Sequence, residues 1–317
     1  SSFAYVSFGV PLASNGEHLK QALELGMMAR ELSRKWDRFD IRCKVNFILG
    51  TYILPWSRHV RELDGVYEEG YRAGLQGGEL LFAGNILAFR LLVPFYQGRH
   101  ISELLEDARR FLTFERKTKN QIATDRVLAC YLPLLNLAGE TPQPLTFVPV
   151  QSDDHPHVPG ETELLEGFRS HRSSIATCVY LIHKGQVLFL YGEYAQAASC
   201  LQQAEPLLPF IMGTLSVVEH CLYTALCAAA MNRPSKAAGR AADGEAENPE
   251  ARAKLMAALE SSLSRMKRWA EHCPENFQHK YLLIAAEIAR LQNRNWEALS
   301  LYDQAIASAA EQDFMHM

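Results

Sequence analysis

Residues 269–306, WAEHCPENFQHKYLLIAAEIARLQNRNWEALSLYDQAI, decide the fold class of this chain. From Leu282 to Ala289, apolar residues recur every three or four positions, which is the spacing of an amphipathic helix. Asn293-Arg294-Asn295 interrupts this pattern with residues typical of a turn. The helical spacing then resumes in a second apolar line formed by Trp296, Leu299, Tyr302 and Ile306.

Small residues alternate with the large ones in both halves of this stretch, so two antiparallel helices can approach closely. Such a helical hairpin of the tetratricopeptide kind buries its apolar face only by stacking on neighbouring hairpins. The rest of the chain repeats the pattern, with helices expected at about 41–54 (ending before Pro55), 80–96, 121–137 and 173–191. We therefore predict an all-α fold of roughly six tetratricopeptide-like hairpins, stacked into a right-handed superhelix that spans residues 1–317.

Composition limits the possible partners. The chain has 317 residues, of which 48% are hydrophobic and 21% charged, as expected of a protein with a large core. Its net charge of −4 argues against a nucleic-acid partner, because such surfaces usually carry a strong basic excess. No uninterrupted apolar run approaches the roughly 18 residues of a membrane span. We expect a cytoplasmic protein.

The seven cysteines contain no CxxC pair, and most lie in apolar helical stretches, so we expect buried free thiols. The chain starts with Ser1-Ser2 and stops at Met317 without a recognisable helix stop, which indicates a segment of a longer protein.

A repeat of 41 residues is visible in the first half of the chain. His18, His59 and His100 each follow a turn, and each precedes the second helix of an expected hairpin. We interpret these histidines as surface residues at helix starts. A shared metal or ligand role is disfavoured, because stacking separates equivalent positions by the width of a hairpin.

Two segments break the helical pattern. Residues 139–160 contain five prolines and form a long loop that either packs across the solenoid or is mobile. Residues 232–249 have almost no large apolar side chain and are interpreted as a flexible linker. The single domain is thus divided into sub-blocks 1–138 and 161–317.

The most metal-like cluster is Asp153-Asp154-His155 with His157, but its proline-rich loop offers no rigid scaffold. Phosphate-loop, zinc-protease and nucleophile-elbow motifs are absent from the sequence. Cys273 precedes Pro274 and resembles an activated nucleophile, yet a helix-capping role explains the same residues better. We predict no catalytic, cofactor-binding or metal-binding residue, and no enzyme activity.

Residues Trp269, Cys273-Pro-Glu-Asn-Phe277 and His279-Lys-Tyr281, together with Trp56, His59 and residues 70–74, resemble the helical repeat region of large multidomain signalling proteins. In that family a serine/threonine-kinase-like domain and a STAND-type (AAA-like) ATPase precede the repeats, and a GAF domain and a sensor histidine kinase of two-component signalling follow them. The resemblance implies a regulatory or scaffold role. It places the ATP-binding and phosphoacceptor motifs in flanking domains, outside this segment.

Two functional hypotheses remain open. In the first, the chain is a non-catalytic scaffold that binds a protein, or the flanking ATPase and kinase domains, in an open groove of mixed polar residues. In the second, it is a sensor that encloses a small inducer in an aromatic-lined cavity. A catalytic helical domain would need convergent titratable groups with shifted pKa values. The candidate binding or packing positions are Tyr52, Trp56, His59, Tyr96, Tyr180, His279, Lys280 and Tyr281.

Overall fold

The computed structural model describes residues 1–14, 16, 18–35, 38–150, 158–232 and 249–315. Fourteen α-helices account for most of these residues, and none of the residues in these ranges lies in a strand. Their bounds are α1 (Ser2–Ser14), α2 (Leu19–Arg34), α3 (Phe39–Ile48), α4 (Leu63–Gly77), α5 (Leu80–Gln97), α6 (Ile101–Thr118), α7 (Gln121–Leu137), α8 (Glu161–Ser170), α9 (Ser174–Leu190), α10 (Tyr194–Ala204), α11 (Ser216–Met231), α12 (Pro249–His272), α13 (Pro274–Leu291) and α14 (Asn295–Glu311).

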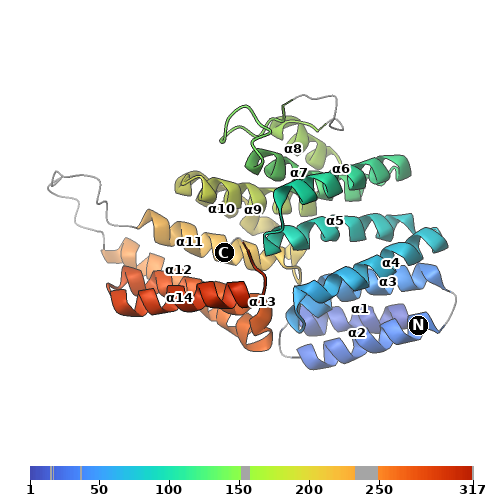
Figure 1. The fold of residues 1–317 in the computed structure, drawn as a ribbon, viewed down its shortest axis with the longest axis horizontal. Coiled ribbons are helices and arrows are strands. Elements are labelled where there is room, and N and C mark those ends of the chain that lie inside the picture. Colours follow the sequence, from blue (N-terminus) through green and yellow to red (C-terminus); the bar gives the residue numbers. More distant parts are fainter. Residues whose placement is uncertain (15, 17, 36–37, 151–157, 233–248, 316–317) are drawn as a thin grey trace.

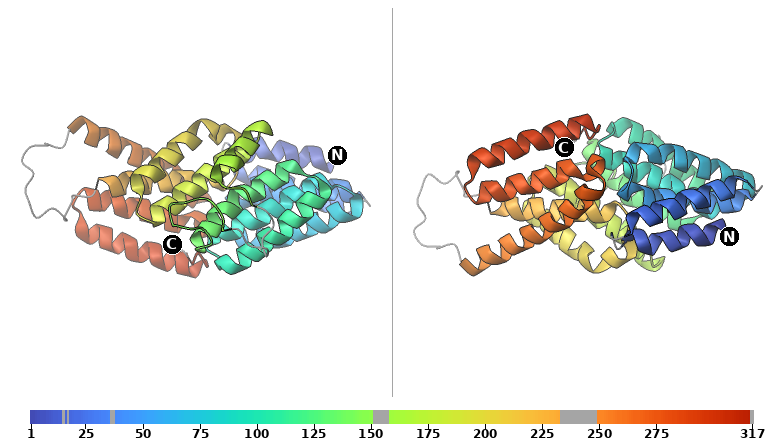
Figure 2. Two further views of the ribbon diagram at one scale, coloured as in Figure 1. Left: turned by 90° about the horizontal axis from the view of Figure 1, so that it is seen from above. Right: turned by 90° about the horizontal axis from the view of Figure 1, so that it is seen from below.

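The helices form two layers of a solenoid (Figure 1). Each odd-numbered helix from α1 to α13 contacts the next odd-numbered one, and most even-numbered helices pack against the odd-numbered helix before them. The expected all-α solenoid is therefore confirmed, with seven helix pairs in the described residues instead of roughly six. The stack curves so that α12 and α13 end beside the ends of the first helices (Figures 1 and 2).

Four odd-numbered helices, α5, α7, α9 and α11, form the centre of the core. In α5, α7, α9 and α11, most residues are buried on every face, whereas α4 and α6 bury only one stripe. The sequence explains this difference, because the buried helices are apolar all round. One of them, α5, is long and apolar enough to cross a membrane (mean hydropathy 1.4), but 72% of that stretch is buried inside the protein.

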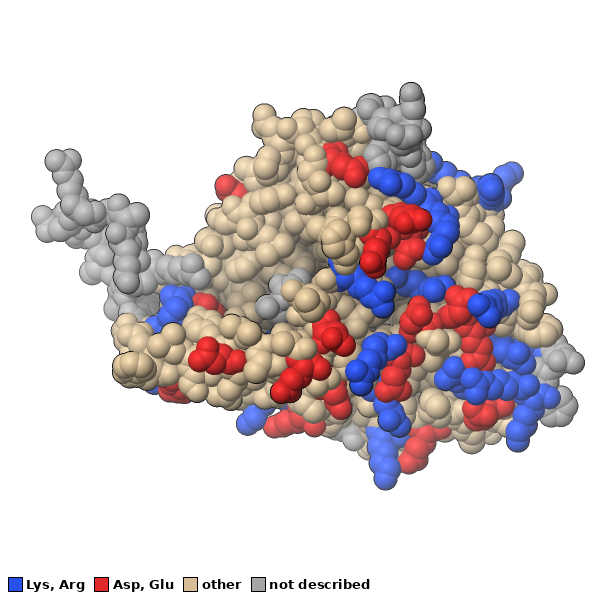
Figure 3. Space-filling view, viewed as in Figure 1, with Lys and Arg blue, Asp and Glu red and all other residues tan. Residues whose placement is uncertain are grey.

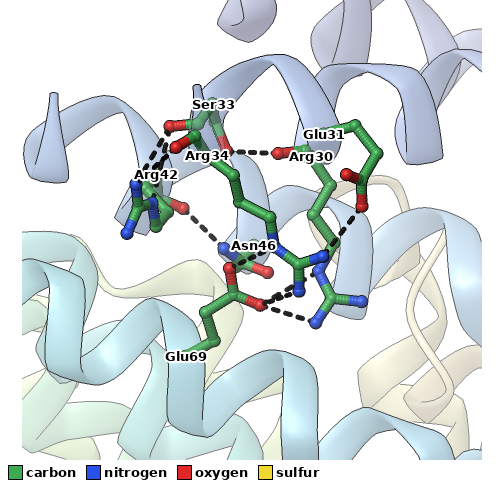
Figure 4. A network of polar contacts seen from close by, with 7 residues as sticks. All are labelled: Arg30, Glu31, Ser33, Arg34, Arg42, Asn46 and Glu69. Carbon is green, nitrogen blue, oxygen red and sulfur yellow. Dashed lines mark hydrogen bonds and ion pairs between the residues drawn. The ribbon is translucent and has the colours of Figure 1, made fainter. Parts of the chain in front are cut away.

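Polar contacts tie the outer layer together at the N-terminal end. Arg30 and Arg34 of α2 both donate hydrogen bonds to the carboxylate of Glu69 on α4, at 2.6–3.1 Å (Figure 4). Burial alone would raise the pKa of Glu69, but the two guanidinium groups outweigh it and lower this pKa to about 2. Glu69 therefore stays ionised and holds the first two helix pairs together.

The helix expected at 41–54 changes its geometry before Pro55. α3 continues as a π-helix (Leu49–Ile53) and then as a 3₁₀ turn (Leu54–Trp56). Gly50 permits this irregular stretch to pack closely, since a Cβ there would lie 2.7 Å from the ring of Tyr67. The wider and then tighter turns direct Trp56 into the protein, where it is 6% exposed.

The described part of the proline-rich loop packs on the solenoid. Phe147 is buried and meets the ring of Tyr180 edge-on, with 6.4 Å between ring centroids. The backbone N–H of Glu161 also donates to the carbonyl of Phe147 at 2.8 Å. Residues 151–157 and 233–248, which include the aspartate–histidine cluster and most of the expected linker, lie outside the described residues.

The prediction for α14 is wrong in one respect. Trp296, Leu299 and Ile306, expected to form a packed apolar line, are 87%, 56% and 61% exposed. The residues that α14 buries are its small ones, Ala298, Ala305 and Ala309. Small side chains allow α13 and α14 to approach closely. The alanine face of α14 therefore packs on the protein, and the face with the large apolar residues is exposed to solvent.

Candidate functional site

A cavity of about 800 Å³ lies where the first helices meet the last ones. Its walls come from the end of α1, the start of α2, the 3₁₀ turn at Trp56, a second 3₁₀ segment (Glu205–Ile211), the start of α11 and the last turns of α12. We call this space the junction cavity. It is lined by Ala13, Gly16, Leu19, Trp56, Glu205, Leu208, Pro209, Met212, Gly213, Val217, Arg265, Arg268, Trp269, Glu271 and His272.

Two indole rings form the aromatic wall of the junction cavity. Trp56 and Trp269 lie 5.8 Å apart between ring centroids, although they are far apart in sequence. Trp56 stacks on Phe277 at 5.6 Å, and its indole N–H donates to the carbonyl of Gly213 at 3.0 Å. Because packing and this hydrogen bond both fix Trp56, the aromatic wall is preformed.

The polar part of the lining comes from α12 and the second 3₁₀ segment. Arg265 and Arg268 are spaced three residues apart, so they share one face of α12. The guanidinium carbon of Arg265 lies 5.4 Å from the centroid of the Trp269 ring, a cation–π contact. Glu205 and His272 also line the cavity. The site combines a rigid aromatic wall with a few charged groups, as small-molecule pockets do.

Asn276 holds the first and last parts of the chain together beside the junction cavity. Its side-chain oxygen accepts from the backbone N–H of Val60 at 3.0 Å, and its amide donates to the carbonyls of Pro55 and Arg58 at 2.7 and 2.8 Å. The side chain is 1% exposed. This residue, within the stretch that resembled the signalling family, therefore joins segments 216 to 221 residues apart.

A cluster of buried polar side chains joins three of the core helices. The hydroxyl of Tyr96 lies 2.7 Å from that of Ser216 and 3.0 Å from Nε2 of His183, so α5, α9 and α11 meet at one point. Burial lowers the pKa of His183 to about 4 and raises that of Tyr96, so both are neutral near pH 7. These contacts pack α5, α9 and α11 together through neutral polar groups.

A second cavity, of about 470 Å³, lies between the end of α6, the start of α7 and α8. Asp125 accepts hydrogen bonds here from Gln121, His171 and Ser173. The set resembles a catalytic triad in composition, but both His171 and Ser173 contact the same carboxylate. In a triad the histidine lies between serine and aspartate. The hydroxyl of Ser173 therefore donates its hydrogen bond to the carboxylate of Asp125, and no histidine among the described residues accepts from it as a general base would.

Of the eight candidate positions from the sequence, Trp56 alone lines the junction cavity. Tyr96 and Tyr180 are core residues, and Lys280 forms a buried ion pair with Glu219, with 3.0 Å between Nζ and Oε1. Three further candidates are packing residues: Tyr52 meets Phe47 edge-on, His279 lies against Phe314 with 4.3 Å between ring centroids, and Tyr281 is half-buried. His59, the eighth candidate, is buried. The sequence analysis missed Arg265, Arg268 and Asn276.

The expectation that the repeating histidines lie on the surface is wrong for His59. His18 and His100 are exposed at the starts of α2 and α6, as expected. His59 begins a 3₁₀ turn (Val60–Glu62) but is 4% exposed, and its Nε2 lies 3.1 Å from the carbonyl oxygen of Gln312. The cause is the curvature of the stack, which brings the end of the chain onto this turn.

Cys273 behaves as expected of a capping residue. It lies at the N-cap of α13, followed by Pro274 in the first turn. Burial raises the pKa of its thiol to about 12, so the reactive thiolate is not formed near pH 7. All seven cysteines are buried, as predicted.

No protein-family model matches this sequence, and no curated protein matches it either. Among solved structures, the chain is similar to a signal transduction ATPase with numerous domains (STAND) that has a tetratricopeptide repeat sensor, from Pyrococcus horikoshii. The identity is 13% and the TM-score 0.41, and the similarity covers 99% of this chain. The chain spans 42% of the length of that protein.

Proposed function

We propose that the chain is a non-catalytic regulatory module that binds a small molecule in the junction cavity. The observation that carries the proposal is the cavity itself, with a volume of about 800 Å³ and a wall built around Trp56 and Trp269. Small-molecule sites typically enclose about 300–1,000 Å³ and combine aromatic walls with a few polar groups. This is the geometry expected of a sensor, the second hypothesis from the sequence.

The position of the cavity supports a regulatory role. A ligand there would contact α1, the turn at Trp56 and α12 at once, and Asn276 of α13 holds that turn against the last helices. Binding stabilises the arrangement that forms the site and shifts the population towards it. The curvature of the solenoid is thereby coupled to occupancy of the cavity, which gives the module an output.

The lining also supports a binding role over a catalytic one. Among the described lining residues there is no serine, threonine, cysteine, lysine or tyrosine, the side chains that most often act as nucleophiles. His183, one of the buried histidines of the core, lies in a packed cluster with Tyr96 and Ser216 and does not line the cavity.

We further propose that the output passes to a protein partner or to flanking ATPase or kinase domains in the cytoplasm. The resemblance of Trp269 and of residues 273–281 to the repeats of such signalling proteins supports this part. Figure 3 shows charged side chains gathered over the region of α2 to α6, with a largely uncharged surface over α9 and α10. Since the inner layer is packed, the partner would contact the outer helices.

Native mass spectrometry of the purified protein tests the sensor function. We expect a reproducible small mass that is lost on mild unfolding. The half-buried cavity residue Val217 offers a blocking variant, Val217→Phe, which should remove the bound mass. Leu190→Phe, on an exposed position of α9, is the matched control and should retain it. A bare polypeptide mass, together with no thermal stabilisation by a library of small metabolites, would refute the proposal.

A further inference from the structure

Arg265 differs from every other half-buried arginine in the part of the chain that the structure describes. Six arginines of similar burial each donate at least one hydrogen bond to a described oxygen atom: Arg30, Arg42, Arg90, Arg109, Arg126 and Arg290. Arg265 has no such acceptor among the described residues, and it lines the junction cavity. A guanidinium group carries five N–H donors, and those of Arg265 are open to the cavity, where solvent or a ligand can accept from them.

The surroundings of Arg265 select the kind of acceptor that is missing. The guanidinium group lies over the Trp269 ring, so contact with this ring helps to orient its planar donors. Arg268, one turn further along the same face of α12, adds a second positive charge without a described ion-pair partner. An oxyanion, which can accept two parallel N–H bonds, suits a guanidinium group best.

The acidic residues of the lining do not cancel these charges locally. Glu271 forms an ion pair with Lys267, with 3.9 Å between Nζ and Oε1, so its charge is already partly balanced. Glu205 lies in the second 3₁₀ segment, is exposed, and forms no ion pair with a described residue. The positive end of the site is thus next to its aromatic wall at Trp269.

We propose that the ligand of the junction cavity is an organic anion with a planar, apolar body. Its carboxylate or phosphate group binds Arg265, with Arg268 assisting, and its ring packs against Trp56 and Trp269. This inference rests on the proposed sensor function and specifies the ligand class. A neutral ligand would leave the donors of Arg265 unpaired, and a cation would be repelled by both guanidinium groups.

Two fluorescent probes of similar shape test the charge requirement. The first is 8-anilinonaphthalene-1-sulfonate, a planar aromatic anion, and the second is N-phenyl-1-naphthylamine, which lacks the sulfonate. We expect Arg265→Gln to weaken binding of the anionic probe at least tenfold, equivalent to about 1.4 kcal/mol, and to leave the neutral probe within twofold. Arg61→Gln, at an exposed arginine outside the cavity, is the matched control and should change neither.

Further arms locate the site and identify the oxyanion. Val217→Phe should abolish binding of both probes, while the near-ultraviolet circular dichroism of each variant shows that native packing is kept. Displacement of the anionic probe is then measured separately with 1-naphthoate and with 1-naphthyl phosphate. The stronger competitor identifies the site as one for a carboxylate or for a phosphate.

The outcomes separate the two proposals. Suppose that both probes bind in the cavity. If Arg265→Gln then weakens both probes equally, or weakens neither of them, the anion inference is overturned and the sensor function stands. If neither probe binds, the anion inference is overturned; if native mass spectrometry also shows a bare polypeptide and no metabolite stabilises the protein, the sensor function itself fails.

Discussion

Replacing Asn276 by alanine should separate the last helix pair from the turn that carries Trp56. The substitution removes a side chain that makes three hydrogen bonds of 2.7–3.0 Å to backbone groups between Pro55 and Val60. The N–H of Val60 would then be buried without an acceptor, since Val60 is 3% exposed. The carbonyls of Pro55 and Arg58 would each lose a donor.

The expected loss follows from counting these groups. An unsatisfied buried backbone group costs about 1–3 kcal/mol, with the lower end for groups that water can still reach. Two of the three bonds are fully buried, and the bond to Arg58 is partly buried. We therefore expect Asn276→Ala to lower the free energy of unfolding by about 3 kcal/mol. Asn276→Asp should cost at least as much, because one carboxylate oxygen would face two carbonyl oxygens.

Urea unfolding followed by two signals is the appropriate assay. Tryptophan fluorescence reports on the junction through Trp56 and Trp269, and far-ultraviolet circular dichroism reports on all helices. Non-coincident transitions in the variant would show that the junction opens before the solenoid unfolds. Asn295→Ala, at an exposed position of α14, is the control and should change stability by less than about 0.5 kcal/mol. A loss below 1 kcal/mol for Asn276→Ala would refute this account of the closure.

Three further predictions concern the core and the surface. Burial raises the pKa of Glu115 to about 8 from 4.5, so the folded state binds its proton more tightly, and stability should fall by about 2 kcal/mol between pH 6 and pH 8. Urea unfolding at pH 6 and pH 8 should show that this fall in stability is about 2 kcal/mol smaller in Glu115→Gln and unchanged in a Glu106→Gln control. An equal fall in the wild type and in Glu115→Gln would contradict the prediction. Lys280→Met should cost about 3–5 kcal/mol by leaving Glu219 buried and unpaired, and adding Glu219→Met should recover part of that loss; a double variant as unstable as the single one would argue against the pair. Trp296→Ala should change the free energy of unfolding by less than about 0.5 kcal/mol, because this side chain is 87% exposed. A loss of stability above about 1 kcal/mol in urea unfolding would show that the indole ring is packed in the folded protein.

The fold class could be predicted from the sequence because each helix carries a local signal. Apolar spacing and turn residues placed the helix at 121–137 at the bounds that the structure shows. The helix expected to end before Pro55 stops being α-helical at Ile48, and its π-helical and 3₁₀ continuation was not predicted. These signals depend on neighbours three or four positions apart, which is the range that sequence patterns record.

The candidate site depends on contacts that sequence patterns do not record. Trp56 and Trp269 form one wall only because the stack curves until its ends meet, and the curvature is the sum of small rotations between many helix pairs. Arg265 carries no local mark, since it becomes unusual only by comparison with the partners of the other arginines. The direction of α14 was mistaken for a related reason: periodicity identifies an apolar face, but whether the small or the large side chains pack is decided by the helix opposite.

The contact between Asn276 and Val60 also has a consequence for the synthesis of the protein. The two residues are 216 positions apart, so the turn at Trp56 leaves the ribosome long before its partner exists. At about 5–20 residues per second, the interval is roughly 10–40 s. During that time the N–H of Val60 and the indole face that Phe277 later covers lack their final partners. We expect the early helix pairs to fold as they emerge, and the junction cavity to form later, in a closing step that requires α13 to have been synthesised.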